Sequence, residues 1–197
     1  MKTALLLFSV LSLSADAALA QSVSPQALPV APEIAAPKDA PFRGTIALQV
    51  DATDTVRHIF RVHETIPVSG PGPTMLLYPR WIPGNHAPTG RIDQVAGLSI
   101  RAGGKPLEWS RDPVDVYAFR VNVPAGVGTL DLDFQIVTPT DGDQGRVVMT
   151  SDMLNLEWNA VALYPAGYFA RQIMVEPGVK LPEGWQFGTA LDTASSK

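Results

Sequence analysis

The chain has 197 residues, with 15 lysines and arginines, 19 aspartates and glutamates and no cysteine, so its formal net charge is −4. Since nucleic-acid-binding domains usually carry a basic face, this balance argues against a nucleic-acid partner. The absence of cysteine excludes disulfides, iron–sulfur clusters, thiolate zinc sites and a cysteine nucleophile. A hydrophobic fraction of 46% is sufficient for a core, which argues against disorder.

The first twenty residues have the parts of a secretory signal peptide. A short basic start at 1–3 precedes an apolar run at 4–13, and residues 18–20, Ala-Leu-Ala, form a cleavage pattern. The apolar run is shorter than the roughly 20 residues that span a bilayer, and no later segment approaches that length. We therefore expect an exported product, periplasmic or extracellular, that begins at Gln21 and has no membrane anchor.

Residues 21–41 have a different composition, in which five prolines interrupt alanine, serine, glutamine and valine. This spacing prevents a helix and favours an extended, polyproline-like linker. A spacer ahead of the folded domain is the simpler interpretation, and a recognition arm is the alternative.

From residue 42 onward the hydrophobic pattern has a period of two, which is typical of half-buried strands. Residues 129–137 alternate most clearly, and Gly103-Gly104 separates two apolar runs as in a hairpin turn. The expected strands are 46–50, 55–67, 74–81, 95–101, 105–109, 114–123, 129–137, 146–150, 154–163 and 171–176. Eight to ten short strands between Gly/Pro turns predict an all-β fold, an antiparallel β-sandwich or barrel over residues 42–197, and we favour the sandwich.

The histidines and acidic loops give little support for a catalytic or metal site. His63 and Glu64 begin like the helix motif of a zinc peptidase, but the motif would end at Pro67, within a strand pattern. We therefore interpret His58 and His63 as ordinary strand histidines and expect no metal ligands. The acidic loop 141–145 lacks the calcium-loop spacing and is interpreted as a polar turn.

Asp131 and Asp133 are two residues apart and share one strand face. A pair of carboxylates can act in acid–base catalysis, but the same spacing is found on any solvated strand face. We favour the solvated face and predict no catalytic residue in this chain.

One loop stands out, because residues 78–90 gather three prolines, two glycines, two aromatic residues and a histidine at the end of a strand. Proline and glycine give such a loop a defined shape, and ordered loops on a β scaffold often carry function. It is either a structural connection that packs Trp81 into the core or a binding or interdomain surface. The candidate site residues on a substrate-side or interdomain surface are Trp81, Pro83, Gly84, Asn85 and His86.

This segment resembles the N-terminal domain of the family M61 glycyl aminopeptidases. The match lies at residues 79–84, Pro-Arg-Trp-Ile-Pro-Gly, and continues at 154–165 and at 181–191. The resemblance covers roughly residues 42–191. The turn at 79–84 is moderately specific and carries no catalytic group.

The resemblance implies a zinc aminopeptidase in which this domain precedes a thermolysin-like catalytic domain and often a PDZ-like domain. This sequence ends at Lys197, and no residue matches the family's zinc ligands or catalytic glutamate. We therefore expect a non-catalytic N-terminal domain of an exported enzyme, which packs on a catalytic domain in cis or in trans and helps shape its substrate cleft. Zinc is expected only in that other domain, and this chain is expected to hold no cofactor.

The alternative is a stand-alone secreted β-sandwich module that binds a peptide or a glycan. Such a module would use exposed aromatic side chains as its platform, with Trp81, Trp109 and Trp158 as the candidates.

Overall fold

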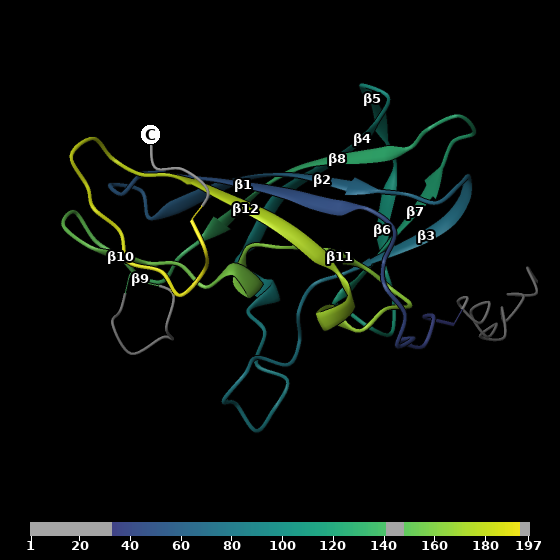
Figure 1. Ribbon diagram of the computed structural model, residues 1–197, viewed down its shortest axis with the longest axis horizontal. Helices are drawn as coiled ribbons and strands as arrows, with labels where there is room; N and C mark the ends of the chain where they lie inside the picture. Colours follow the sequence, from purple (N-terminus) through teal and green to yellow (C-terminus); the bar gives the residue numbers. More distant parts are fainter. Residues whose placement is uncertain (1–32, 141–147, 194–197) are drawn as a thin grey trace, which may run out of the picture. The chain divides into compact units, whose positions relative to one another are not determined.

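The computed structural model describes residues 33–140 and 148–193, which form an all-β domain with three short 3-10 helices (Figure 1). The strands are β1 (Thr45–Asp54), β2 (Ile59–Pro67), β3 (Gly72–Leu77), β4 (Val95–Ala102), β5 (Lys105–Leu107), β6 (Trp109–Arg111), β7 (Ala118–Val123), β8 (Thr129–Val137), β9 (Val148–Met149), β10 (Leu154–Asn155), β11 (Tyr164–Pro165) and β12 (Met174–Lys180). The 3-10 helices are η1 (Ile92–Gln94), η2 (Trp158–Ala160) and η3 (Ala170–Gln172). The expected signal peptide and the acidic loop 141–145 lie outside the described residues.

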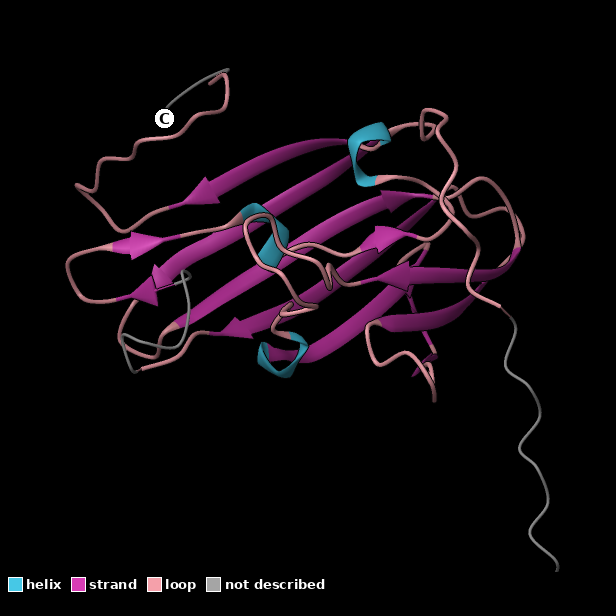
Figure 2. Cartoon of the chain, turned by 90° about the horizontal axis from the view of Figure 1, so that it is seen from below, coloured by secondary structure: helices cyan, strands magenta, loops and turns pink. Residues whose placement is uncertain are grey.

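Two larger sheets enclose the core. One has six strands in the order β12-β1-β2-β8-β4-β5, and the other has four in the order β11-β3-β7-β6. Figure 2 shows most strands side by side along the domain, with the 3-10 turns between them. Buried side chains of both sheets belong to a single hydrophobic cluster. The predicted all-β sandwich is therefore confirmed, and the described strands number twelve, rather than eight to ten, because the short strands β6 and β11 were not expected as separate strands.

The period-two pattern determines which face of each strand is buried. In β8, the inner positions Leu130, Leu132, Phe134 and Ile136 are buried and alternate with more exposed residues. In β1, alternate residues from Ile46 to Ala52 are buried in the same way. Each large aliphatic side chain buried here contributes roughly 1.5–3 kcal/mol to folding.

The β4–β5 hairpin forms where the sequence predicts it. Gly103 and Gly104 have φ angles of 56° and 76° between the two strands. A two-residue hairpin turn of this kind requires positive φ at both central positions, which glycine adopts without a steric penalty.

Three details of the predicted strand pattern are wrong. Strand β12 pairs with β1 in parallel, whereas we expected an antiparallel sheet. A local hydrophobic pattern specifies that a segment is a strand but not the direction in which it meets a distant partner. The expected strand 154–163 is β10 followed by η2, where the N–H of Ala160 donates to the carbonyl of Glu157 and closes a tight turn.

The histidine before β2 also differs from expectation. His58 lies in the turn between β1 and β2 with a φ of 57°, not in a strand. The N–H and the hydroxyl of Thr138 both donate to the His58 carbonyl oxygen, which holds this turn against the end of β8.

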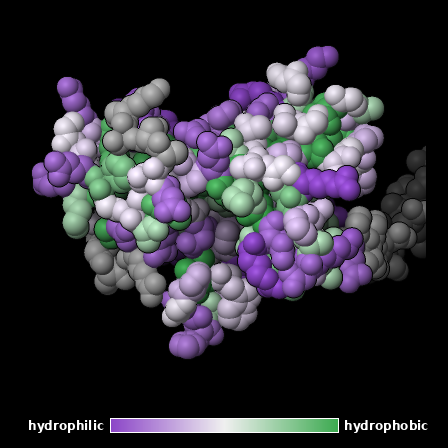
Figure 3. Space-filling view, viewed as in Figure 1, coloured by the Kyte–Doolittle hydropathy of each residue, from purple (hydrophilic) through white to green (hydrophobic). Residues whose placement is uncertain are grey.

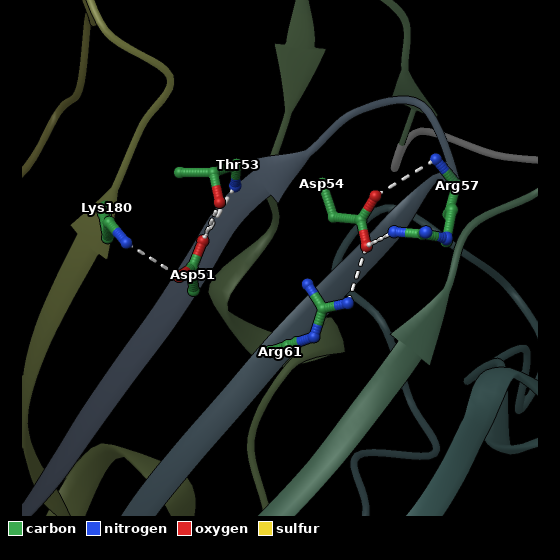
Figure 4. Close-up of polar contacts among 6 residues, drawn as sticks. All are labelled: Asp51, Thr53, Asp54, Arg57, Arg61 and Lys180. Atoms are coloured by element: carbon green, nitrogen blue, oxygen red, sulfur yellow. Dashed lines mark hydrogen bonds and ion pairs between the residues drawn. The ribbon is translucent and has the colours of Figure 1, made fainter.

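The outer face of the six-stranded sheet is polar and internally paired. Near its β12 edge, Lys180 Nζ lies 3.2 Å from Asp51 Oδ2 (Figure 4). At the β1–β2 turn, Asp54 accepts from Arg61 at 2.6 Å and from Arg57 at 3.3 Å. Such exposed pairs contribute little to stability, but they show that this face is built for contact with water.

Part of the proline-rich segment is attached to the domain. The N–H of Lys38 donates to the Gly167 carbonyl at 3.0 Å, and the N–H of Phe42 donates to the Gln172 carbonyl at 2.9 Å. Asp39 pairs with Arg171 at 2.9 Å. The last residues of the expected linker therefore run along the segment that precedes β12.

Candidate functional site

The loop after β3 contains a tight turn at its tip. The N–H of Asn85 donates to the Ile82 carbonyl at 3.0 Å, which makes residues 82–85 a β-turn. Pro83 occupies its second position and Gly84, with a φ of 84°, its third, as a type II turn requires. The side-chain amide of Asn85 donates to the Thr89 hydroxyl at 2.6 Å and ties the two sides of the tip together.

The base of this loop is fixed by packing and hydrogen bonds. The N–H of Gly90 donates to the Arg80 carbonyl at 2.9 Å, and the Tyr117 hydroxyl donates to the Gly90 carbonyl at 3.1 Å. A Cβ atom at Gly90 would lie 2.0 Å from the carbonyl oxygen of Pro79, so only glycine fits. Arg80 pairs with Asp115 at 3.1 Å and lies over the Tyr117 ring. The loop is therefore held rigidly where it leaves the domain.

All five candidate residues on this loop are exposed: Trp81, Pro83, Gly84, Asn85 and His86. Trp81 keeps 62% of its surface exposed, so the interpretation that it packs into the core is wrong. The tip projects from the body as the teal loop at the bottom of Figure 1. Trp81 and Pro83 line a cavity, and Gly84, Asn85 and His86 are not among its lining residues.

That cavity has a volume of about 620 Å³ and lies between the loop, β1, β2, β11, η2 and β12. Its walls are mostly apolar, with Ile46, Leu48 and Leu163 buried and Val175 and Leu191 half exposed. Figure 3, in the same view as Figure 1, shows this face hollowed above the lobe formed by the loop. The volume falls in the range of roughly 300–1,000 Å³ typical of ligand sites.

Glu64 is the unexpected residue of this cavity. It is 0% exposed, and its neighbours across the sheet are Leu48 on β1 and Leu132 on β8. Its Oε2 accepts the N–H of Leu163 at 3.0 Å, whereas Oε1 has no hydrogen-bond partner among the described residues. Burial away from water raises the pKa of Glu64 well above its ordinary value, with the Leu163 bond as a weaker opposing effect.

The sequence contained a signal for this residue that the motif search missed. Phe60, Val62, Glu64 and Ile66 occupy alternate positions of β2, and all four are buried. A glutamate in phase with three apolar strand residues is predicted to face the core. The incomplete zinc-peptidase motif at His63 and Glu64 does not reveal this placement.

Two further polar residues line the cavity beside Glu64. The hydroxyl of buried Tyr78 donates to the Ala160 carbonyl at 2.9 Å and so holds η2 against β3. Burial raises the pKa of Tyr78, and the charge of Asp93 adds to this shift. Asn159, on η2, has a buried Nδ2 without a hydrogen-bond partner among the described residues.

The carboxylate pair on β8 lies on the solvated face, as we favoured. Asp133 accepts from His63 Nδ1 at 2.8 Å and also pairs with Arg101, and Asp131 accepts from the Thr65 hydroxyl at 3.0 Å. The hydrogen bond from His63 is the largest of the effects that lower the pKa of Asp133. Within residues 33–140 and 148–193, no group of three His, Cys, Asp or Glu side chains is placed to hold a metal ion.

The three candidate tryptophans differ in exposure. Trp81 is exposed, whereas Trp158 is half-buried in the cavity wall. Trp109 is half-buried, packs edge-on against Phe119 and donates its indole N–H to the Leu98 carbonyl at 3.2 Å. Of the three, only Trp81 presents most of its surface to solvent. In the described part of the chain, no helix is long and apolar enough to span a bilayer.

Fold and cavity together define a β-sandwich domain with a ligand-sized, largely apolar hollow beside a rigid loop. The sequence matches the family model for the peptidase M61 N-terminal domain over residues 47–197, so the chain belongs to this family. A solved aminopeptidase N family protein from Idiomarina loihiensis has a similar fold, with a TM-score of 0.58 and 16% identity over 71% of this chain. The alignment covers 22% of that chain, and at this identity the likeness concerns the fold alone. No curated protein matches the sequence.

Proposed function

We propose that this domain packs on the catalytic domain of an M61-like zinc aminopeptidase, in cis or in trans, and helps shape its substrate cleft. The observation that carries the proposal is the family match over residues 47–197. In this arrangement the zinc and the catalytic carboxylate belong to the other domain. The contribution of this chain is to position a surface beside the cleft and to exclude water from it.

The distribution of exposed side chains supports a specific docking face. The outer face of the six-stranded sheet carries paired charges, which remain solvated at low cost. The cavity rim instead exposes Trp81, Val175 and Leu191, which gain free energy when covered. We therefore assign the rim and the loop residues Trp81, Pro83, Gly84, Asn85 and His86 to the interdomain or substrate side.

Reconstitution tests this assignment. The domain and an M61-like catalytic domain are produced separately and mixed, and the release of glycine from a glycyl anilide is measured. We expect a complex and a gain of activity, and we expect Trp81→Ala to weaken both. Val56→Ala is the matched control, because Val56 is 88% exposed on the β1–β2 turn, away from the cavity lining. Absence of both a complex and a gain with the wild-type domain would contradict the proposal.

We also propose that the chain is exported, because residues 1–20 follow the signal-peptide pattern. Expression of the full sequence in a Gram-negative host should deliver a product that begins at Gln21 outside the cytoplasm. A cytoplasmic product that still begins at Met1 would refute export.

The second candidate function is a stand-alone secreted module that binds a peptide or a glycan. The cavity with Trp81 on its rim is the observation that favours it. A stand-alone module should remain monomeric at high concentration, whereas a domain that has lost its partner should associate through the exposed rim. Sedimentation of the isolated chain over a range of concentrations separates the two.

A further inference from the structure

Two residues that line the cavity carry buried polar atoms that nothing in the described chain satisfies. Glu64 Oε1 and Asn159 Nδ2 both lack a hydrogen-bond partner, and both residues line the cavity. An unsatisfied buried group costs roughly 1–3 kcal/mol, and native proteins rarely keep one without a function or a bound partner. Two such groups in one ligand-sized hollow point to a guest that supplies the missing bonds.

The protonation of Glu64 decides what the guest must offer. Because Leu48 and Leu132 flank this buried carboxyl, its pKa lies well above the ordinary value and its neutral form is favoured. With Oε2 accepting from Leu163, the proton lies on Oε1, which then becomes a donor. The amide nitrogen of Asn159 is also a donor. The guest must therefore present an acceptor.

A carbonyl oxygen fits these two donors, whereas an ammonium group carries only donors. The apolar walls also select a neutral guest, since transfer of a charged group into such surroundings costs far more than transfer of an amide. The cavity of about 620 Å³ has room for a large side chain beside the carbonyl.

We propose that this cavity binds a neutral peptide segment, which places one apolar side chain against Leu48 and Leu163 and accepts hydrogen bonds at a backbone carbonyl from Glu64 and Asn159. Trp81 and Leu191, which line the cavity and are exposed, are then available to cover the peptide backbone. This site needs no catalytic domain. Failure of the reconstitution described above would leave it intact, and its own failure would leave the interdomain proposal intact.

Most of the other charged and titratable groups that line the cavity already have partners. Arg80 and Asp115 pair with each other, and Tyr78 donates to Ala160. Tyr117 donates to Gly90, and Tyr164 lies on β11. Glu64 is therefore the group whose ionisation changes the hydrogen-bonding character of the cavity floor.

Calorimetric titration of the full chain with three matched compounds tests the proposal. N-Acetylphenylalaninamide is neutral, phenylalaninamide carries an ammonium group, and N-acetylphenylalanine carries a carboxylate. We expect the neutral amide to bind at least about tenfold more tightly than either charged compound, because only it avoids burying a charge. Its affinity should fall as pH rises through the raised pKa of Glu64, because the carboxyl then loses the donated proton.

Variants assign the binding to these side chains. Glu64→Leu and Asn159→Ala should each weaken the neutral amide by about five- to tenfold, the loss expected for one hydrogen bond. Glu64→Gln keeps a neutral donor, so it should retain binding and lose the pH dependence. Asp133→Asn, which changes a carboxylate on the outer face of the same sheet, should leave the affinity unchanged.

Three outcomes would overturn the proposal. Tighter binding of phenylalaninamide would mean that Glu64 acts as an anion for an amine. If the neutral amide bound equally well to the wild type, Glu64→Leu and Asn159→Ala, its binding site would lie outside this cavity. No binding by any of the three compounds would mean that water alone fills the cavity floor.

Discussion

His63 and Glu64 are neighbours on β2, yet they lie on opposite faces of the same sheet in opposite environments. His63 faces outward and pairs with Asp133 at 2.8 Å. Asp133 also pairs with Arg101, and its side chain is partly exposed to solvent. Glu64 faces inward between Leu48 and Leu132, with one oxygen bonded and the other without a partner. Because successive side chains of a strand point to opposite faces, a carboxyl can be buried one residue away from a solvated ion pair.

The two carboxyls respond in opposite directions. The pKa of Asp133 is lowered, first by the hydrogen bond from His63, so the outer face favours its charged form. Desolvation raises the pKa of Glu64, so the inner face favours its neutral form. Of the two, only Glu64 retains an oxygen without a hydrogen-bond partner among the described residues. Its carboxyl is therefore the one available to hydrogen-bond a ligand.

The largest expected effect on stability comes from removing a packed side chain on the inner face of the sheet. Leu132 is 0% exposed and lies beside Glu64, so Leu132→Ala should destabilise the domain by about 2–5 kcal/mol. Gln135→Ala, at an outward position of the same strand, should change the free energy of unfolding by no more than about 0.5 kcal/mol. Urea unfolding measures both. If both variants lost a similar free energy of unfolding, the inner and outer faces of β8 would not differ in packing as described.

A second test uses Glu64→Gln, which keeps the shape and removes the titration. A raised folded-state pKa means that the folded protein binds the proton more tightly than the unfolded chain. Stability is then fully present at low pH and falls as pH rises from the ordinary glutamate range toward the folded-state pKa, by up to about 1.4 kcal/mol per pH unit.

The variant should therefore equal the wild type near pH 4 and become more stable than the wild type as pH rises to 8. Thermal unfolding at several pH values in this range measures the difference between the two proteins. A difference that stays constant with pH would show that Glu64 does not titrate differently in the folded and unfolded states.

The smallest expected effect is on the outer face, and its pH dependence has the opposite sign. The folded-state pKa of Asp133 is lowered, so its contribution is present above the ordinary aspartate range and is lost as pH falls. Because the pair is well exposed, Asp133→Asn should cost less than about 1 kcal/mol near pH 7. The same unfolding series checks this, and a loss that grows toward low pH would contradict it.

Part of the fold could be predicted because the information is local. The alternation at 129–137 identified β8, and two adjacent glycines located the β4–β5 hairpin. The same local reasoning predicted that the loop has a defined shape, and the structure places Pro83 and Gly84 in its turn. Strand period, turn chemistry and the family resemblance all depend on residues that are close in sequence.

Other features were inaccessible because they depend on contacts between distant segments. The parallel pairing of β12 with β1 joins residues about 130 positions apart, and no local pattern encodes its direction. Leu163 reaches Glu64 across 99 residues, and the Tyr78 hydroxyl fixes η2 across 82. Only these long-range contacts place Asn159 and Glu64 around one cavity.

The alternation of Glu64 with Phe60, Val62 and Ile66 is enough to predict that its side chain faces inward. That this position borders a cavity rather than a filled core follows from contacts between distant segments of the chain. Hydrophobic period specifies a face, but whether the space beyond that face is filled depends on how the two sheets and the loop above them meet. The same long-range packing leaves one oxygen of a buried carboxyl without a partner.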